Sequence, residues 1–283
     1  MSSRSGIEDQ SLYVGWGEPA VGDGLASRAS AADARESGQL LDLEVLLPTL
    51  NEESRVGAAI RELTDYLEAR QLRASITVID NGSSDRTVDV VAGFADSSIP
   101  VNLIGCARRG KGAAVRKAVM RSTARWVGFA DTDLSTPIET LDHVLSALRA
   151  GSDIVVASRR CTGATYTVRQ PLLRRVGGYG FRRLTASYVP SVSDTQCGFK
   201  FFERETARKF FGQATLDGFA FDVEILGLAH LSGKAIAEVP VAWRDDDSSS
   251  FRLLLDGQRV AREVVELRRM FERDPASRAH SRS

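Results

Sequence analysis

Short apolar runs alternate with longer amphipathic segments along most of the chain. Several runs have the length and the flanking turn residues of strands, at residues 43–47, 75–79, 101–104, 126–130, 154–157 and 235–241. Between them, apolar residues recur at helical spacing, as at Val56, Ile60 and Leu63 within residues 55–70. Helices are also expected from about residue 85 and at residues 112–120, 137–148, 169–189, 205–211, 221–232 and 253–270. Residues 194–202 fit a short strand or a hairpin.

Strands that alternate with helices predict an α/β fold, in which a mostly parallel, Rossmann-like sheet is flanked by helices. Ligands bind such sheets beyond the carboxyl ends of the strands, so the polar segments that follow the strands form the candidate site. We expect one domain over residues 40–271. Residues 1–39 are rich in Gly, Ser, Ala and Asp and are expected to be a disordered arm, and residues 272–283 a flexible tail.

Composition narrows the classes of function. The 283 residues can bury a full core, and 43% hydrophobic and 26% charged residues are ordinary globular values. Lys and Arg total 37 and Asp and Glu total 37, so no overall positive field favours nucleic acid, and no nucleic-acid partner is expected. The three cysteines lack C-x-x-C spacing, and no apolar run resembles a signal peptide or reaches the ~18 residues of a membrane span. We therefore expect a cytoplasmic protein, soluble or peripherally attached to a membrane.

The segment Asp131-Thr132-Asp133 carries the strongest local signal for chemistry. It directly follows the apolar run 126–130, so its two carboxylates can reach one cation at the strand end. Mg²⁺ prefers one or two carboxylates together with phosphate oxygens, and a metal held by Asp131 and Asp133 can neutralise a departing diphosphate. The structural alternative is that the two aspartates cap the helix that follows.

Two further polar turns follow apolar runs. In DNGSSD, Asp80 can accept a hydrogen bond from a nucleobase, while Gly82 permits close backbone approach and Ser83 shares the turn. An ordinary β-to-α turn has the same composition. The sequence GCARRGKG at residues 105–112 resembles a phosphate-binding P-loop but ends in Gly where that loop needs Ser or Thr. Lys111 is either an anion contact at a helix start or a surface lysine.

The second half of the chain offers arginine and acidic candidates. Asp194 lies in the segment DTQCGFK, and Asp222 and Glu224 lie two apart on a predicted helix. The latter two therefore point to different sides, so one can face a cleft while the other makes a structural ion pair. The three histidines are scattered, which argues against a Ser-His-Asp hydrolase. The arginines form either a phosphate site or a solvated basic face: Arg159, Arg160, Arg169, Arg174, Arg175, Arg182 and Arg183.

A set of segments in a fixed order points to a known family. They are LPTLNEE, VIDNGSSDRT, GKGAAVRKA, FADTDLSTP, ASR, SDTQCGFKFF, FDVEIL and EVPVAW. With them the chain resembles inverting family-two glycosyltransferases of the GT-A fold over residues 43–270. It is most similar to the polyprenyl-phosphate branch, which includes the dolichyl-phosphate β-glucosyltransferases.

The resemblance implies a GT-A sheet with helical insertions on the acceptor side. It also implies metal-dependent transfer of a sugar, with inversion, from a nucleotide sugar to a polyprenyl or dolichyl phosphate. The expected donor is UDP-glucose and the expected cofactor is Mg²⁺ or Mn²⁺. Peripheral contact with a membrane fits such an acceptor.

The resemblance and the turns above assign roles to residues. Donor-binding residues are Pro48, Asn51, Glu52, Asp80, Gly82, Ser83, Lys111, Asp131 and Thr132. The metal ligands are Asp131 and Asp133. Catalytic residues are Asp133, Arg159, Arg174, Asp194 and Asp222, and the acceptor side contains Gln196 and Glu224.

The chemistry expected of the site depends on the acceptor. The oxygen of a lipid phosphate is already an anion, so it can attack the anomeric carbon without a strong base. A hydroxyl acceptor needs a base, for which Asp222 or Asp194 is the candidate. A soluble acceptor such as a secondary-metabolite or antibiotic core stays open, because the chain reads YVPSVS before DTQCGFK, where relatives carry a GVRG-like stretch.

Two other functions fit the sequence less well. A nucleotidyltransferase also uses a parallel sheet and acidic metal ligands, but its phosphate loop follows the first strand, where TLNEE lacks glycines. A degenerate nucleotide-sugar-binding subunit is disfavoured by the intact acidic pair and by Asp80.

Overall fold

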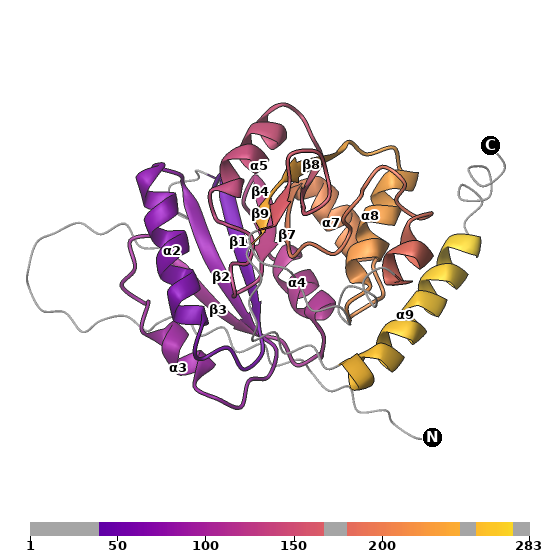
Figure 1. Ribbon diagram of the computed structural model, residues 1–283. Helices are drawn as coiled ribbons and strands as arrows, with labels where there is room; N and C mark the ends of the chain where they lie inside the picture. Colours follow the sequence, from indigo (N-terminus) through magenta and orange to yellow (C-terminus); the bar gives the residue numbers. More distant parts are fainter. Residues whose placement is uncertain (1–39, 167–179, 244–252, 274–283) are drawn as a thin grey trace, which may run out of the picture.

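A single mixed sheet forms the centre of the molecule. The computed structural model describes residues 40–166, 180–243 and 253–273, and within them the sheet has seven strands in the order β3-β2-β1-β4-β7-β5-β8 (Figure 1). Every pairing is parallel except those of β7, which runs antiparallel to β4 and β5. The strands are β1 (Leu43–Thr49), β2 (Ala74–Asp80), β3 (Val101–Gly105), β4 (Trp126–Ala130), β5 (Ile154–Ser158), β7 (Phe199–Glu203) and β8 (Ile236–Pro240). The sheet is therefore mostly parallel, as the sequence predicts.

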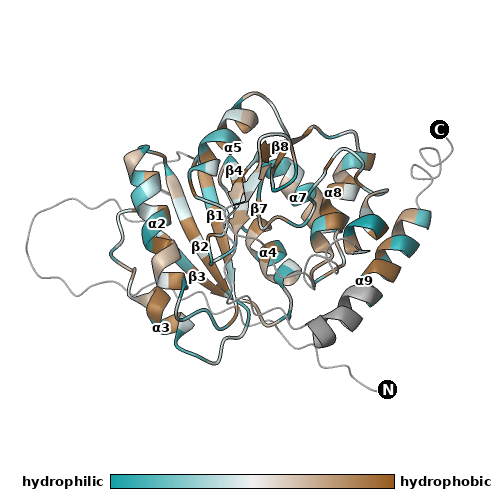
Figure 2. Cartoon of the chain, in the orientation of Figure 1, coloured by the Kyte–Doolittle hydropathy of each residue, from teal (hydrophilic) through white to brown (hydrophobic). Residues whose placement is uncertain are grey.

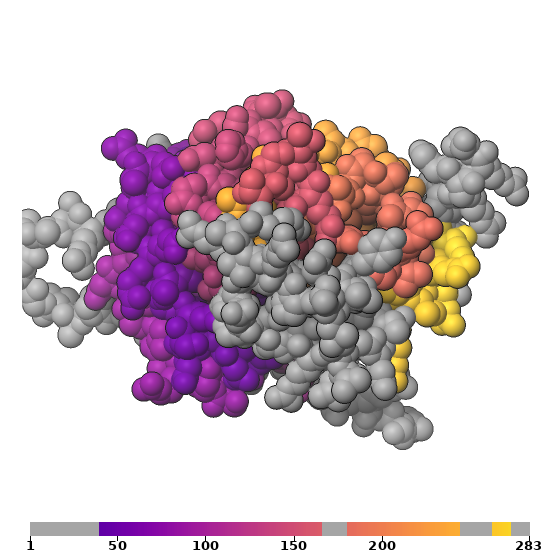
Figure 3. Space-filling view, viewed as in Figure 1, coloured from indigo at the N-terminus to yellow at the C-terminus, as the bar shows by residue number. Residues whose placement is uncertain are grey.

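Helices cover both faces of this sheet. One face packs against α2 (Val56–Ala69), α3 (Thr87–Ala92) and α5 (Thr140–Arg149). The other packs against α4 (Lys111–Val119), α7 (Arg204–Gln213), α8 (Phe221–Leu231) and α9 (Leu253–Arg273). Helices α2 and α3 lie on one side of the molecule and α8 and α9 on the other (Figures 1 and 3).

Alternate side chains of each strand enter two separate cores. Val45 and Leu47 of β1 belong to the first core, whereas Leu46 between them belongs to the second. Such strands are buried on both faces, so they read as continuous apolar runs rather than as alternating patterns. Figure 2 shows apolar residues on the strands and on the helix sides that face them.

Residues 194–202 contain the short strand, and not the hairpin, of the two alternatives that the sequence leaves open, because β7 is a single strand inserted between β4 and β5. Two details differ from the sequence-based expectations. The helix expected from Pro137 begins at Thr140, after a tighter turn in which the carbonyls of Pro137, Ile138 and Glu139 accept from the N–H groups three residues later. An unpredicted parallel pair of short strands, β6 (Thr165–Tyr166) and β9 (Ala242–Trp243), holds the segment after β8.

Some predictions fall outside the described residues. These include the N-terminal arm of residues 1–39, Arg174 and the chain beyond residue 273. Of the helix expected at 169–189, the structure describes residues 180–189, and 180–185 are helical. Helix α9 includes the first two residues of the expected tail at 272–283. Within the described ranges, no helix combines the length and the apolarity that a membrane span needs.

The topology brings the candidate segments to one edge of the sheet. The parallel strands end there, β1 just before Asn51, β2 at Asp80, β4 before Asp131 and β5 before Arg159. Because β7 runs in the opposite direction, it begins at this edge, directly after Gly198. Residues from distant parts of the sequence therefore surround one site.

Candidate active site

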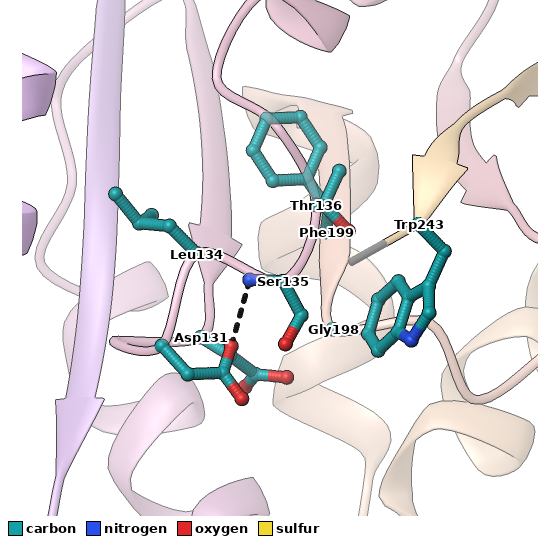
Figure 4. A pocket seen from close by; sticks show the side chains of 8 residues that line it. Asp131, Leu134, Ser135, Thr136, Gly198, Phe199 and Trp243 are labelled. Atoms are coloured by element: carbon teal, nitrogen blue, oxygen red, sulfur yellow. Dashed lines mark hydrogen bonds between the residues drawn. The ribbon is translucent and has the colours of Figure 1, made fainter. Parts of the chain in front are cut away.

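The acidic pair lies in a tight turn directly after β4. The Leu134 backbone N–H donates to the carbonyl of Asp131 (3.1 Å), and the Ser135 N–H donates to Asp133 Oδ1 (2.9 Å; Figure 4). Leu134 takes a left-handed conformation (φ 43°), which is rare for a residue with a side chain. The turn opens on a hollow lined by Asp131, Asp133, Leu134, Ser135, Thr136, Gly198, Phe199 and Trp243.

A glycine lets the start of β7 approach this turn. The Asp131 N–H donates to the carbonyl of Gly198 (3.1 Å). A Cβ on Gly198 would lie 1.8 Å from Asp131 Oδ2, which is far inside contact distance. Only glycine therefore allows the carboxylate of Asp131 its observed position.

Two lysines lie among the carboxylates. Lys111 Nζ is 2.5 Å from Asp131 Oδ1, and Lys200 Nζ is 2.7 Å from Asp222 Oδ1. Lys200 and Asp222 are buried, so water contributes little to their solvation. Burial lowers the pKa of Lys111, but the carboxylates of Asp131 and Asp222 outweigh it and hold that pKa above its ordinary value. Lys111 is therefore a cation beside Asp131.

The acidic groups favour a cationic partner. Burial raises the pKa of Asp133, and the neighbouring Asp131 carboxylate raises it further. Burial also raises the pKa of Asp222, against the opposing effect of Lys200 and Lys111. A positive charge shared by Asp131 and Asp133 would offset the desolvation and the repulsion of the two carboxylates.

The donor set of Asp131 and Asp133 fits a hard cation that also takes phosphate oxygens. Mg²⁺ sites commonly use one or two carboxylates and leave the other positions to phosphate and water. Among the described residues, no group of three or more His, Cys, Asp or Glu side chains gathers around one point. The pair is thus suited to a cation shared with a ligand, and not to a closed protein cage.

Hydrogen bonds join the loops after β1 and β2. The Asn51 N–H donates to Ser83 Oγ (2.9 Å), and the Ser84 N–H donates to Asn51 Oδ1 (2.8 Å). The Glu52 N–H donates to Thr87 Oγ1 (2.8 Å). Asn51 has φ 58°, a conformation that asparagine tolerates better than most residues. Asn51 therefore ties the loop after β1 to the loop after β2.

Asp80 ends β2 with its carboxylate held by its own turn. The backbone N–H groups of Gly82 and Ser83 donate to its two oxygens at 3.2 Å. A carboxylate has about four acceptor positions, so Asp80 retains capacity for a ligand N–H. Pro48 is half-buried in β1 opposite Ile79 on β2, one position from Asp80.

Glu52 and Thr132 connect this region to the acidic turn. Burial raises the pKa of Glu52, and Arg55, Thr132 and Asp133 also act on it, so it lies close to the acidic pair. Thr132 is buried between the two aspartates. The structure thus brings the predicted donor-binding residues to one edge around Asp131 and Asp133.

The turn that carries Lys111 is held by two residues that sequence reasoning missed. Asn81 donates to the carbonyl of Arg108 (2.8 Å) and accepts from the Gly110 N–H (2.7 Å). The carbonyl of Asp217 accepts from the Gly112 N–H (2.8 Å), while its carboxylate pairs with Arg108 and with Arg116 (3.1 Å). Asn81 belongs to the DNGSSD turn that the sequence indicates, but no sequence pattern links Asp217 to the turn that carries Lys111.

Arg159, which is half-buried, forms a two-pronged ion pair with the buried Asp194. Arg159 Nε donates to Asp194 Oδ2 (2.6 Å) and Nη2 donates to Oδ1 (2.8 Å). Burial alone would raise the pKa of Asp194, but Arg159 outweighs it and holds that pKa below its ordinary value. Asp194 is therefore a poor proton acceptor, which counts against its predicted role as a base and favours a role in orienting Arg159.

The remaining predicted residues differ in position. Glu224 is fully buried, and its carboxylate accepts from the Thr215 N–H (2.7 Å), the Thr215 hydroxyl (2.9 Å) and the Leu216 N–H (2.8 Å). It shapes the loop before α8 and does not line the hollow, whereas Asp222 on the same helix faces Lys200. Gln196 is half-buried beside Asp194, to which its N–H donates (3.4 Å).

Comparisons with known proteins agree with this geometry. The model of glycosyl transferase family 2 matches residues 44–211. A dolichyl-phosphate beta-glucosyltransferase of Dictyostelium discoideum is 30% identical over 240 residues, covering 80% of this chain and 73% of that relative. Its Drosophila melanogaster counterpart is 33% identical over 231 residues, covering 76% of this chain and 70% of that relative.

The fold also matches a solved glycosyltransferase structure. Glucosyl-3-phosphoglycerate synthase from Mycobacterium tuberculosis, solved with Mn²⁺, UDP-glucose and phosphoglyceric acid, aligns with a TM-score of 0.57 at 20% identity. The alignment covers 88% of this chain and 83% of that chain, and it supports the GT-A fold. The family match over more than half of the chain, together with relatives at about 30% identity, shows that this chain is a glycosyltransferase and belongs to glycosyl transferase family 2.

Proposed function

We propose that this glycosyltransferase moves glucose from UDP-glucose to a polyprenyl or dolichyl phosphate, with inversion at the anomeric carbon. The relatives that cover most of the chain are dolichyl-phosphate beta-glucosyltransferases by name. The observation that carries the proposal is the acidic pair Asp131 and Asp133, which lies beside Lys111 at the sheet edge that also bears Asp80. This combination suits a nucleoside diphosphate at one end and its sugar at the other.

The proposed donor contacts follow from the chemistry of each group. Asp80 accepts a hydrogen bond from the ring N–H of uracil, in a pocket bordered by Pro48, Asn51 and Ser83. Lys111 contributes positive charge to the diphosphate. Glu52 and Thr132 support the turn that presents the two aspartates.

A divalent cation, Mg²⁺ or Mn²⁺, belongs to the same proposal. Asp131 and Asp133 would hold it, and their oxygen donors fit its preference. When bound, it would supply charge neutralisation for the departing diphosphate. A protein of the same fold was solved with Mn²⁺ and UDP-glucose, which supports this choice.

The charged groups around the hollow favour an acceptor that needs no base. Asp194 is engaged by Arg159 and has a lowered pKa, so it is unsuited to removing a proton. The other candidate base, Asp222, is buried and paired with Lys200 at 2.7 Å. The oxygen of a lipid phosphate is already negative, and Arg159 can orient it once Asp194 has fixed the guanidinium. We place such a protein in the cytoplasm, in peripheral contact with the membrane that carries the acceptor.

The test uses the purified full chain with UDP-glucose, a polyprenyl phosphate and Mn²⁺. We expect release of UDP and formation of one β-linked glucosyl lipid phosphate, identified by mass spectrometry and by NMR of the anomeric proton. GDP-mannose and UDP-N-acetylglucosamine serve as alternative donors, and a soluble hydroxyl compound as the alternative acceptor. Release of pyrophosphate would indicate nucleotidyl transfer, and transfer only to the hydroxyl compound would overturn the lipid acceptor. Binding of UDP without turnover would overturn the enzymatic role.

A further inference from the structure

Trp243 lines the acidic hollow and carries a buried hydrogen-bond donor. The residue is only 8% exposed, and its indole Nε1–H has no hydrogen-bond partner among the described residues. A buried N–H without a partner is destabilising, and buried tryptophans usually find one. An unpaired indole N–H on a residue that lines a candidate binding site therefore points to a ligand atom as its partner.

The ring of Trp243 is fixed in place before any ligand binds. Its backbone belongs to β9, which pairs with β6 through Tyr166. The guanidinium of Arg159 lies 4.7 Å from the centre of the ring, and Arg159 is itself held at both ends by Asp194. A rigid donor of this kind loses little entropy when it binds.

The hollow is a narrow crevice in this structure, and the side chains that line it favour one class of ligand. Its lining combines the carboxylates of Asp131 and Asp133, the hydroxyls of Ser135 and Thr136, and the indole of Trp243. None of the described residues that line it is Lys, Arg or His, and the nearby cations Lys111 and Arg159 are already paired with Asp131 and Asp194. Carboxylates, hydroxyls and an aromatic ring instead suit a neutral ligand with several hydroxyl groups and an apolar C–H face.

The position of the hollow identifies that ligand within the proposed reaction. It begins at the two aspartates assigned to the diphosphate, and Trp243 lines the same space (Figure 4). A sugar joined to that diphosphate must lie within a few bonds of the aspartates. Trp243 is thus within reach of the sugar. Asp80, the proposed contact of the base, is farther away: it ends β2, and the strands β1 and β4 lie between β2 and β7, which begins at the lining residue Phe199.

We propose that Trp243 is a specificity-determining residue that binds the transferred hexose. Its Nε1–H donates a hydrogen bond to one hydroxyl oxygen of the sugar. This inference rests on the proposed function, because it takes a sugar diphosphate as the donor. It assigns to Trp243 a contact with the sugar and none with the nucleotide or the acceptor.

The first test compares the binding of UDP-glucose and UDP by calorimetry in the presence of Mn²⁺. Trp243→Phe keeps an aromatic ring but removes the N–H, so we expect the affinity for UDP-glucose to fall about three- to tenfold. The affinity for UDP should stay within about twofold of the wild-type value, because UDP lacks the sugar. The matched control is Trp126→Phe, since Trp126 is 4% exposed, also lies beside an arginine (4.5 Å) and starts β4 at the opposite edge of the sheet. It should leave both affinities unchanged.

A series of donor analogues identifies the hydroxyl. UDP-glucose analogues that each lack one sugar hydroxyl are titrated into the wild type and Trp243→Phe. We expect one analogue to bind the wild type about three- to tenfold more weakly than UDP-glucose does. The variant should bind that analogue and UDP-glucose with equal affinity. If the removal of each hydroxyl weakens binding by the same factor in the wild type and in the variant, the hydrogen bond does not exist.

A measurement on the unmodified chain covers the case in which the variant does not fold. The indole N–H signal of Trp243 in a ¹⁵N-labelled protein should shift when UDP-glucose is added and should not shift with UDP. The inference would be overturned if Trp243→Phe lost the same affinity for UDP-glucose and for UDP, or kept both affinities unchanged. It would also be overturned if the indole N–H signal did not shift when UDP-glucose was added. A wild type that does not bind UDP at all would instead overturn the proposed function, and this inference with it.

Discussion

At the scale of single residues, the acidic pair opposes folding while it suits a reaction. The raised pKa of Asp133 means that the folded chain binds a proton at this position more tightly than the unfolded chain does. At neutral pH the carboxylate is ionised in the unfolded chain, so its burial beside Asp131 destabilises the fold. Buried charged groups that are kept although they destabilise the fold are characteristic of functional sites.

Replacing Asp133 with Asn should therefore separate activity from stability. We expect Asp133→Asn to lower kcat by about 10²-fold or more, because a charge-stabilising ligand is lost, and to raise the melting temperature. Glucosyl transfer and a thermal melt without ligand measure the two effects. Asp153→Asn, at the opposite edge of the sheet, is the control and should leave kcat unchanged. Full activity of Asp133→Asn would remove Asp133 from the metal site.

The sequence could predict which residues reach the site better than it could predict their partners. Asp80 and Asp131 each sit at or directly after an apolar run, so the topology of a parallel sheet places them at one edge. The state of Asp194 depends on Arg159, which is close in space but distant in sequence. No pattern along the chain reports that both oxygens of Asp194 are engaged, or that the N–H of Trp243 is not.

At the scale of elements, the loop between α7 and α8 fixes the start of α4. Asp217 pairs with Arg108 and Arg116 and accepts from the backbone of Gly112, on either side of Lys111. The position of Lys111 Nζ against Asp131 therefore depends on a side chain that does not touch the site. Asp217 is a positioning residue in this sense.

Asp217→Asn should raise the KM for the donor about three- to tenfold with a small change in kcat, because Lys111 loses its fixed position. Steady-state kinetics with UDP-glucose measures this split. The control is Asp153→Asn, since Asp153 is similarly exposed (26% against 23%) and pairs with Lys234 at 2.8 Å. Both variants should melt a few degrees lower, but only Asp217→Asn should alter KM. A matching KM for the two variants would assign Asp217 to stability alone.

A second element-level contact joins α2 to α5. Arg70 donates twice to Asp142 (2.6 Å each), and the hydroxyl of Tyr66 donates to it as well (2.6 Å). The hydrogen bonds from Arg70, with help from Tyr66 and against burial, lower the pKa of Asp142 to about 2 from an ordinary value of 3.8. This carboxylate stabilises the fold when it is ionised, so its contribution is complete above pH 5 and disappears as the pH falls from about 4 to about 2.

Asp142→Asn should therefore lower the melting temperature by about 1–3 °C at neutral pH, a small effect because the pair is exposed to solvent. The gap to the wild type should close between about pH 4 and pH 2. Thermal melts across this range measure it. Asp65→Asn, an exposed residue of α2, should show no gap that depends on pH. A gap for Asp142→Asn that persists at pH 2 would show that the contact is not ionic.

At the scale of the whole molecule, α9 completes the second core. Leu267 and Phe271 are buried, and the ring of Phe271 stacks on Tyr188 at 4.7 Å. A Cβ on Gly227 of α8 would lie 2.3 Å from Phe271, so the two helices touch at a glycine. Glu263 of α9 also accepts from the Ala220 N–H (2.8 Å), directly before α8 and Asp222.

Phe271→Ala should destabilise the fold by about 3–5 kcal/mol, because it leaves a cavity where a buried ring packs. Urea unfolding of the full chain measures the free energy of unfolding. Val265→Ala on the exposed side of the same helix is the control and should change that free energy by less than about 0.5 kcal/mol. Equal effects of the two changes would mean that α9 does not pack as described.

The overall architecture was predictable, whereas one strand of it was not. The apolar runs identify the parallel strands because each is buried on both faces and is followed by a polar turn. In contrast, the direction of β7 is set by its neighbours β4 and β5, and not by any feature of its own residues. The short strands β6 and β9 have two residues each, too few for a periodic signal.

The insertion of β7 also determines the order in which the molecule can be assembled. During synthesis, β4 and β5 leave the ribosome before β7, which pairs with both of them. Until residue 203 has emerged, β4 has one edge without its native partner and β5 has both, because β8 follows β7 in the chain. Such edges invite pairing with other chains, and contacts between distant segments form slowly. β4 and β5 therefore pass through a stage in which their pairing depends on sequence that has not yet been made.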